Sequence, residues 1–144
     1  MAQLTPDEIL RYQQEGWVRP SYRLPQARTA VAVWAICAPT DEEALRLSAS
    51  SRMMMLHLYR GQLIAVPQVD RALRFLEQEG APIAAIPPNR RMITGCPDRV
   101  RAQIESVAAE YGAEEAFVVN IMFDHGARRR SYDLLAAAFG LPCR

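Results

Sequence analysis

The chain has few cysteines and histidines, no long apolar run and no excess of charge of either sign. Its 144 residues include only three cysteines, Cys37, Cys96 and Cys143, and two histidines, His57 and His125. The cysteines are odd in number, widely spaced and without CxxC spacing. This pattern indicates neither a disulfide framework nor a zinc site, and we expect free thiols.

No stretch approaches the ~18 apolar residues of a membrane-spanning helix, and the N-terminal segment lacks the apolar core of a signal peptide. We therefore expect a cytoplasmic protein with no membrane partner. Seventeen Lys and Arg against sixteen Asp and Glu give a formal net charge of +1, which argues against nucleic acid as a partner. Half of the residues are hydrophobic and 23% are charged, so the composition predicts one compact domain, residues 1–144.

Three strands, each followed by a helix, are predicted along the chain. The apolar runs at residues 29–38 and 116–122 are typical of strands buried on both faces of a parallel sheet, and residues 91–94 are short and β-compatible. Thr40 and Asp124 stand where helix N-caps are expected. Alternation of strand and helix favours an α/β fold with a parallel sheet.

The other helix boundaries follow from proline and glycine. Pro97 suits the first position of a helix that ends at Gly112. The first long helix should end before Gly61, and a shorter one, with Val69 on its apolar side, should end at Gly80. Irregular structure is expected after Gly80, because prolines follow it.

Four strings, read in order, resemble luciferase-like flavin-dependent monooxygenases. They are RPS-x-x-L at residues 19–24, the strand and A-x-T-D-E-E-A helix start at 31–47, the turn TGCPDRV at 94–100, and the strand and D-H-x-x-R-x-R-S-Y helix at 112–136. The resemblance covers about residues 12–141. It implies a partial (β/α)8 TIM-barrel-like fragment holding strands six to eight, because a whole barrel needs ~250 residues.

The resemblance also implies a function, a cofactor and partners. Family members use FMN or another reduced flavin and dioxygen to oxygenate a substrate at the barrel mouth. We expect this chain to be part of, or a relic of, such an enzyme, inactive alone because much of the flavin site lies in the absent strands. It should form a homo-oligomer or bind a complementary N-terminal barrel subunit. The alternative is a non-enzymatic α/β interaction module that dimerises.

Four residues are candidate flavin contacts. Thr94, Gly95 and Cys96 form a turn between a strand and a helix, where free amides and the helix dipole could bind a phosphate. The alternative is that Gly95 only permits a tight turn and that Cys96 only caps the helix. Asn120 lies in an otherwise apolar strand, so its amide could face a barrel lumen or a ligand.

The remaining cysteine and histidine candidates are interpreted as structural residues. Cys96 as a nucleophile would need a histidine partner that the sequence does not identify. His125 is expected to pack or cap the last helix, and His57, near a helix end, to complement the helix dipole or lie on the surface. The opening residues 4–16 are similar to the start of phytanoyl-CoA dioxygenases, but the H-x-D/E string that would bind iron in that class is missing.

Overall fold

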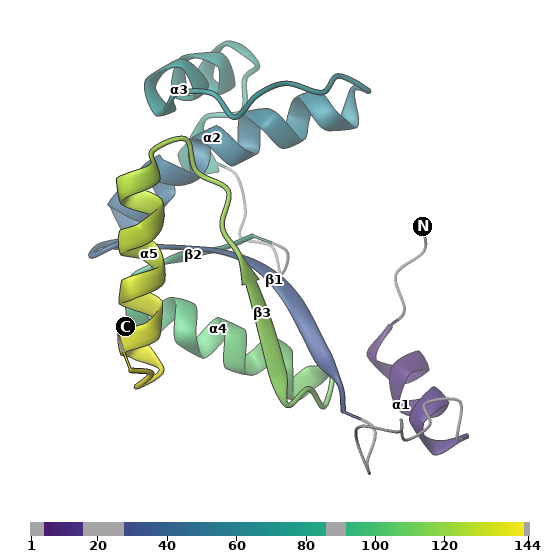
Figure 1. Cartoon of the computed structure of the whole chain (residues 1–144). Helices are drawn as coiled ribbons and strands as arrows, with labels where there is room; N and C mark the ends of the chain where they lie inside the picture. The colour runs from purple at the N-terminus through teal and green to yellow at the C-terminus, as the bar shows by residue number, and fades with distance from the viewer. Residues whose placement is uncertain (1–4, 16–27, 86–91, 143–144) are drawn as a thin grey trace.

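The computed structural model describes residues 5–15, 28–85 and 92–142 (Figure 1). Along the chain the elements are α1 (Pro6–Gln14), β1 (Ala30–Cys37), α2 (Asp41–Tyr59), α3 (Val69–Gln78), the 3-10 turn η1 (Ile83–Ala85), β2 (Met92–Gly95), α4 (Pro97–Glu110), β3 (Glu115–Val119) and α5 (His125–Ala138). The string at residues 19–24, the start of the predicted strand at Arg91, and Cys143 lie outside the described residues.

The strands form one parallel sheet in the order β2-β1-β3. Trp34 is opposite Met92 on one side and Val119 on the other, and Cys37 is opposite Gly95. The predicted mixed α/β fold with three parallel strands is confirmed. A run of consecutive barrel strands would place β2 in the middle. Here β1 is central, an order found in doubly wound sheets.

The predicted helix boundaries are confirmed by their caps. The Thr40 hydroxyl accepts from the Glu43 amide at 3.2 Å, and Asp124 Oδ1 accepts from the Ala127 amide at 2.6 Å. Both bonds satisfy amides that have no partner within the first turn of a helix. Gly112 follows α4 with φ 57°, a conformation that favours glycine.

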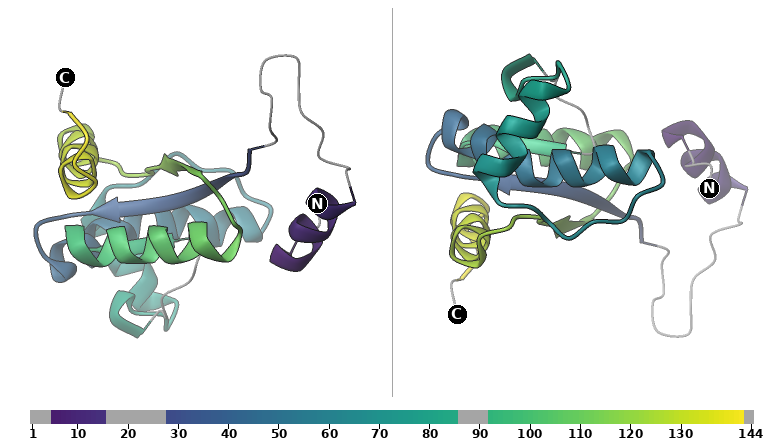
Figure 2. Two further views of the ribbon diagram at one scale, coloured as in Figure 1. Left: turned by 90° about the horizontal axis from the view of Figure 1, so that it is seen from below. Right: turned by 90° about the horizontal axis from the view of Figure 1, so that it is seen from above.

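One face of the sheet is covered by α4 and α5, the covered face (Figures 1 and 2). Its core contains residues of the sheet and of both helices: Val33, Ala35, Cys37, Ile93, Val100, Ile104 and Leu135. All of these side chains are at most 5% exposed. Burial of this size is the main favourable contribution to folding.

The opposite face is covered by α2 only toward the carboxyl ends of the strands, where Ile36 packs against Ala44 and Leu47. Farther back, Phe117 is 61% exposed and Val119 is 41% exposed. Ala32 and Trp34 pair with these two residues. These four residues define the open face, at whose border with α2 Trp34 and Val119 also line a small cavity. The prediction that the last strand is buried on both faces was wrong, because β3 is an edge strand and no helix of the described chain covers this side of it.

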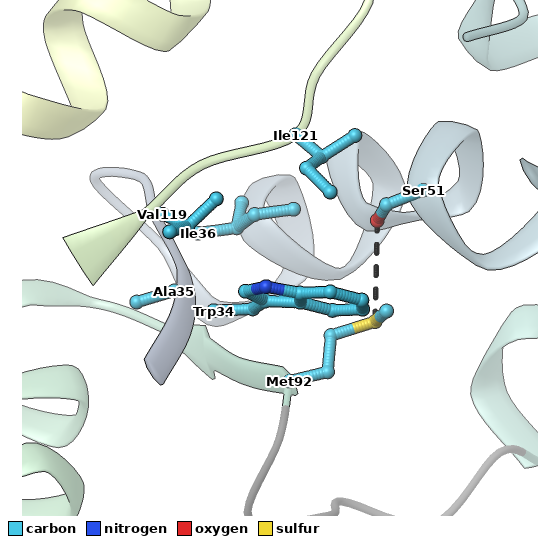
Figure 3. Close-up of a pocket in the computed structure, with 7 residues that line it drawn as sticks. All are labelled: Trp34, Ala35, Ile36, Ser51, Met92, Val119 and Ile121. Carbon is cyan, nitrogen blue, oxygen red and sulfur yellow. Dashed lines mark hydrogen bonds between the residues drawn. The ribbon is translucent and has the colours of Figure 1, made fainter. Parts of the chain in front are cut away.

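Between β1 and α2 a small cavity is lined by Trp34, Ala35, Ile36, Ser51, Met92, Val119 and Ile121 (Figure 3). Its volume is about 10 Å³, room for at most one water molecule. On the side away from the sheet, α2 packs against α3 through Ala49, Met53, Ala72 and Leu76.

Among the described residues, no helix combines the length and apolar character that a bilayer crossing needs.

Candidate functional site at the carboxyl ends of the strands

All four predicted site residues lie at the carboxyl ends of strands, where α/β proteins place their ligands. Thr94 and Gly95 end β2, Cys96 is the N-cap of α4, and Asn120 follows β3. However, β1 separates β2 from β3, and neighbouring strands lie ~4.8 Å apart. The residues therefore form two groups, one at the Gly95 turn and one at Asn120.

At the Gly95 turn, the helix N-terminus is already occupied by a carboxylate of the same chain. The Cys96 amide donates to Asp41 Oδ1 at 2.7 Å, and Arg99 Nη1 donates to Asp41 Oδ2 at 2.9 Å. The backbone bond from Cys96 lowers the pKa of Asp41, and the Arg99 guanidinium lowers it further. Of the amides expected to be free at this turn, that of Cys96 is therefore bonded to Asp41 instead.

A glycine is needed at position 95 because a side chain would not fit there, and not because the backbone conformation demands it. A Cβ at this position would lie 2.8 Å from Asp41 Oδ1 and 2.9 Å from Arg99 Cδ. Its φ is not in the left-handed region. The absence of a side chain therefore admits the Asp41–Arg99 pair. Cys96 occupies the N-cap, but its side chain makes no capping bond, so the capping role proposed for its thiol is not observed.

The two described cysteines are free thiols at this end of the sheet. Cys37 is buried, and burial together with the neighbouring Cys96 raises its pKa to about 11. A thiol with such a pKa is protonated near neutral pH and is a poor nucleophile. Neither histidine is placed to activate Cys96: the His125 ring contacts Arg128, and the His57 ring stacks on Phe75 in the α2–α3 pair.

Asn120 belongs to a buried hydrogen-bond cluster with α5. Its Nδ2 donates to Ser131 Oγ at 2.9 Å, and the same hydroxyl accepts from the Cys37 amide at 2.8 Å. The Asn120 amide N–H donates to Tyr132 Oη at 3.1 Å. The side chain thus bonds to α5, not into a lumen. Its Oδ1 is buried without a partner, and exchanging the amide O and N would only leave the NH2 group unpartnered instead.

Thr94 lies on the α2 side of the sheet, opposite Ile36 in the register. Its hydroxyl is also buried and has no partner in the described structure. A buried polar atom without a hydrogen bond is costly. Thr94 and Asn120 therefore each contribute one unsatisfied atom, but on different faces and on different sides of β1.

Sequence reasoning missed four residues that organise this end of the sheet: Asp41, Arg99, Ser131 and Tyr132. Asp41 was interpreted only as part of a helix start. The signal in the sequence was an acidic residue, Asp41, just after the first predicted strand, together with a basic residue, Arg99, in the first turn of the helix that follows the second. For Ser131, the signal was a small polar residue on the otherwise apolar side of α5.

No family model matches the chain. Three curated proteins of Bacillus subtilis (strain 168), all described as uncharacterized, are similar to it. YceB is 31% identical over 122 residues, YwcH 34% over 123 and YvbT 29% over 120. The YceB and YwcH matches cover 84% of this chain but only 37% of each relative.

The fold is also similar to a solved structure, the crystal structure of apo-MsnO8. The two agree with a TM-score of 0.82 and 34% identity, over 96% of this chain and 42% of the MsnO8 chain. This chain therefore spans less than half the length of the proteins that it matches.

Proposed function

We propose that this chain corresponds to the C-terminal part of a luciferase-like flavin-dependent monooxygenase, as one portion of the enzyme or as a relic of it, and that it does not catalyse oxygenation alone. The observation that carries the proposal is a match running through nearly all of this fold but through only 42% of MsnO8. The ordered strings at residues 31–47, 94–100 and 112–136 support the family.

The residues present do not fit a flavin phosphate at the predicted turn. Asp41 accepts from the Cys96 amide and pairs with Arg99, so a phosphate would have to displace this carboxylate from both partners. The cavity beside Trp34, at about 10 Å³, cannot hold a flavin ring. We therefore assign the flavin contacts of the complete enzyme mainly to the portion that this chain does not contain.

The proposal includes a (β/α)8 barrel-like fold in the complete enzyme. The order β2-β1-β3 departs from the consecutive strand order of such a barrel, so the sheet of the complete enzyme would have to depart from that order at these strands. Because β1 is bonded on both sides, further strands can be added only at the outer edges of β2 and β3. The open face around Phe117 and Val119 would then be covered by the rest of the barrel. Such cover would remove an exposed apolar surface and an unpaired edge.

A complementation experiment tests this proposal. The chain is mixed with the portion of MsnO8 that lies outside the match, and FMN is added while flavin fluorescence is followed. We expect no saturable binding by the chain alone at micromolar FMN, and quenching when both portions are present. Submicromolar FMN binding by the chain alone, lost on Gly95→Phe, would contradict the assignment of the flavin contacts. A failure of the two portions to associate would contradict the split enzyme.

The second candidate is a non-enzymatic module that dimerises through the open face. The observation that favours it is the exposure of Phe117 on an edge strand. Sedimentation equilibrium of the wild type should then give a dimer, which Phe117→Glu converts to a monomer. Leu63→Glu is the matched control, because Leu63 is 88% exposed and lies outside the sheet. A wild-type monomer of 16.2 kDa would contradict this module.

A further inference from the structure

The groove between α2 and α3 is a second candidate site, remote from the strand ends. It is lined by Met53, His57, Arg71, Arg74, Phe75 and Gln78 and has a volume of about 340 Å³. Small-molecule sites typically measure ~300–1,000 Å³, so the groove suits a ligand of one or two rings. We propose that it binds a small aromatic carboxylate, an inference that does not depend on the proposed function.

The lining of the groove includes an apolar side chain and two aromatic rings. Met53 is only 3% exposed, and it belongs to the core that joins α2 to α3. Beside it the rings of His57 and Phe75 are stacked, with their centroids 4.9 Å apart and their planes at 28°. Stacked rings offer a planar ligand both apolar contact and an aromatic face. This chemistry favours an aromatic ligand over an aliphatic one.

The rim of the groove carries two arginines that form no ion pair with any described residue. Arg71 and Arg74 are three residues apart on α3, so they lie on the same side of the helix. Neither forms an ion pair within residues 5–15, 28–85 and 92–142, whereas Arg46, Arg60 and Arg99 pair with carboxylates. A guanidinium binds a carboxylate through parallel N–H bonds. The two arginines therefore specify an anionic group at the rim.

The ring of His57 lines the groove, but one of its nitrogens is buried and not open to a ligand. Its Nδ1 contacts Gln62 Oε1 at 2.8 Å, which leaves Nε2 buried and without a partner in the described structure. The ion pair with Arg60 is the main cause of the lowered pKa of Glu79, and the nearby His57 adds to it. Among the described residues, no carboxylate is hydrogen-bonded to the His57 ring. The groove thus differs from the Gly95 turn, where the Asp41 carboxylate is bonded to the Cys96 amide.

The test is an NMR titration of the isotope-labelled chain with benzoate, with benzamide as the uncharged ligand of the same shape. We expect saturable shifts confined to the groove residues, and benzamide binding weaker by about tenfold or more because it lacks the charge. Cyclohexanecarboxylate should also bind more weakly than benzoate, because it lacks the aromatic plane.

Two double variants make the test specific. Arg71→Gln with Arg74→Gln should weaken benzoate binding by about tenfold or more. Arg129→Gln with Arg130→Gln is the control, because these exposed arginines of α5 give the same change in charge and should leave binding unchanged. Equal effects of the two double variants, equal binding of benzoate and benzamide, or shifts that do not saturate would each overturn the proposal.

Discussion

The covered face and the open face are built from the same strands but differ in what surrounds them. Val33 on the covered face is 2% exposed, whereas Phe117, on the neighbouring strand but on the open face, is 61% exposed. Alternate residues of a strand point to opposite faces, so the difference comes from the helices that pack on each side. The covered face is therefore packed against helices, whereas the described residues leave the open face exposed.

The largest expected effect is on the covered face. Ile104 of α4 is 2% exposed and packs in the main core. Ile104→Ala should lower the free energy of unfolding by about 2–5 kcal/mol, from lost burial and the cavity left behind. Urea unfolding followed by circular dichroism measures the change.

The matched substitution on the open face is Val119→Ala. Because Val119 is 41% exposed, its truncation should cost within about 0.5 kcal/mol in the monomer. A loss at Val119 as large as that at Ile104 would mean that the open face is covered in solution, and would contradict the difference between the faces.

The second prediction compares two buried hydroxyls. Ser131 Oγ accepts from the Cys37 amide and from Asn120 Nδ2, so Ser131→Ala leaves buried donors unpaired. It should cost about 1–3 kcal/mol in the free energy of unfolding. Thr94→Val removes a hydroxyl that has no partner and should be neutral or stabilising. A cost at Thr94 equal to that at Ser131 would show that its hydroxyl is in fact bonded.

The elements could be predicted from sequence because their signals are local. The apolar run of β1, the caps Thr40 and Asp124, and Gly112 each depend on a few neighbouring residues, and the structure places their elements within one or two positions of the prediction. The predicted end of β3 was less accurate. The apolar run continues to Met122, but pairing with β1 stops at Val119, and Met122 packs on the α2 side instead.

The sequence could predict where the candidate site residues lie in the fold, but not which residues they contact. Strand ends and helix starts marked Gly95 and Asn120, but their partners lie far along the chain. Asp41 reaches the Cys96 amide across 55 residues, and Ser131 reaches the Cys37 amide across 94. The strand order decides these contacts, because it places β1 in the middle. Local patterns carry no information on that order.

Gly95→Ala tests the carboxyl end of the sheet, where the two faces meet. The new Cβ would crowd Asp41 Oδ1 and Arg99 Cδ, and we expect a loss of about 1–2 kcal/mol in the free energy of unfolding. In an Asp41→Ala background the same substitution should cost less, because one of the crowded atoms is gone. Equal costs in both backgrounds would contradict the explanation that Gly95 makes room for Asp41.

The smallest expected effect is the acid dependence of the Asp41 bond. The Cys96 amide and Arg99 lower the pKa of Asp41 in the folded chain below the value of about 3.9 for an unfolded chain. Above this pH the carboxylate is ionised in both states and its stabilisation is fully present. As the pH falls, the unfolded chain binds the proton first, so the stabilisation is lost until the folded carboxyl is also protonated.

Asp41→Asn isolates this contribution. The pKa values of Glu8 and Glu79 are also lowered, but both residues are present in the two proteins and cancel in the comparison. The difference in the free energy of unfolding between wild type and Asp41→Asn should therefore be constant from about pH 5 to 7 and decrease below about pH 4. Because the Arg99–Asp41 pair is about half exposed, added salt should reduce the difference. Urea unfolding at several pH values measures it, and a difference that stays constant down to pH ~2 would show that the Asp41 carboxylate does not bind the Cys96 amide in solution.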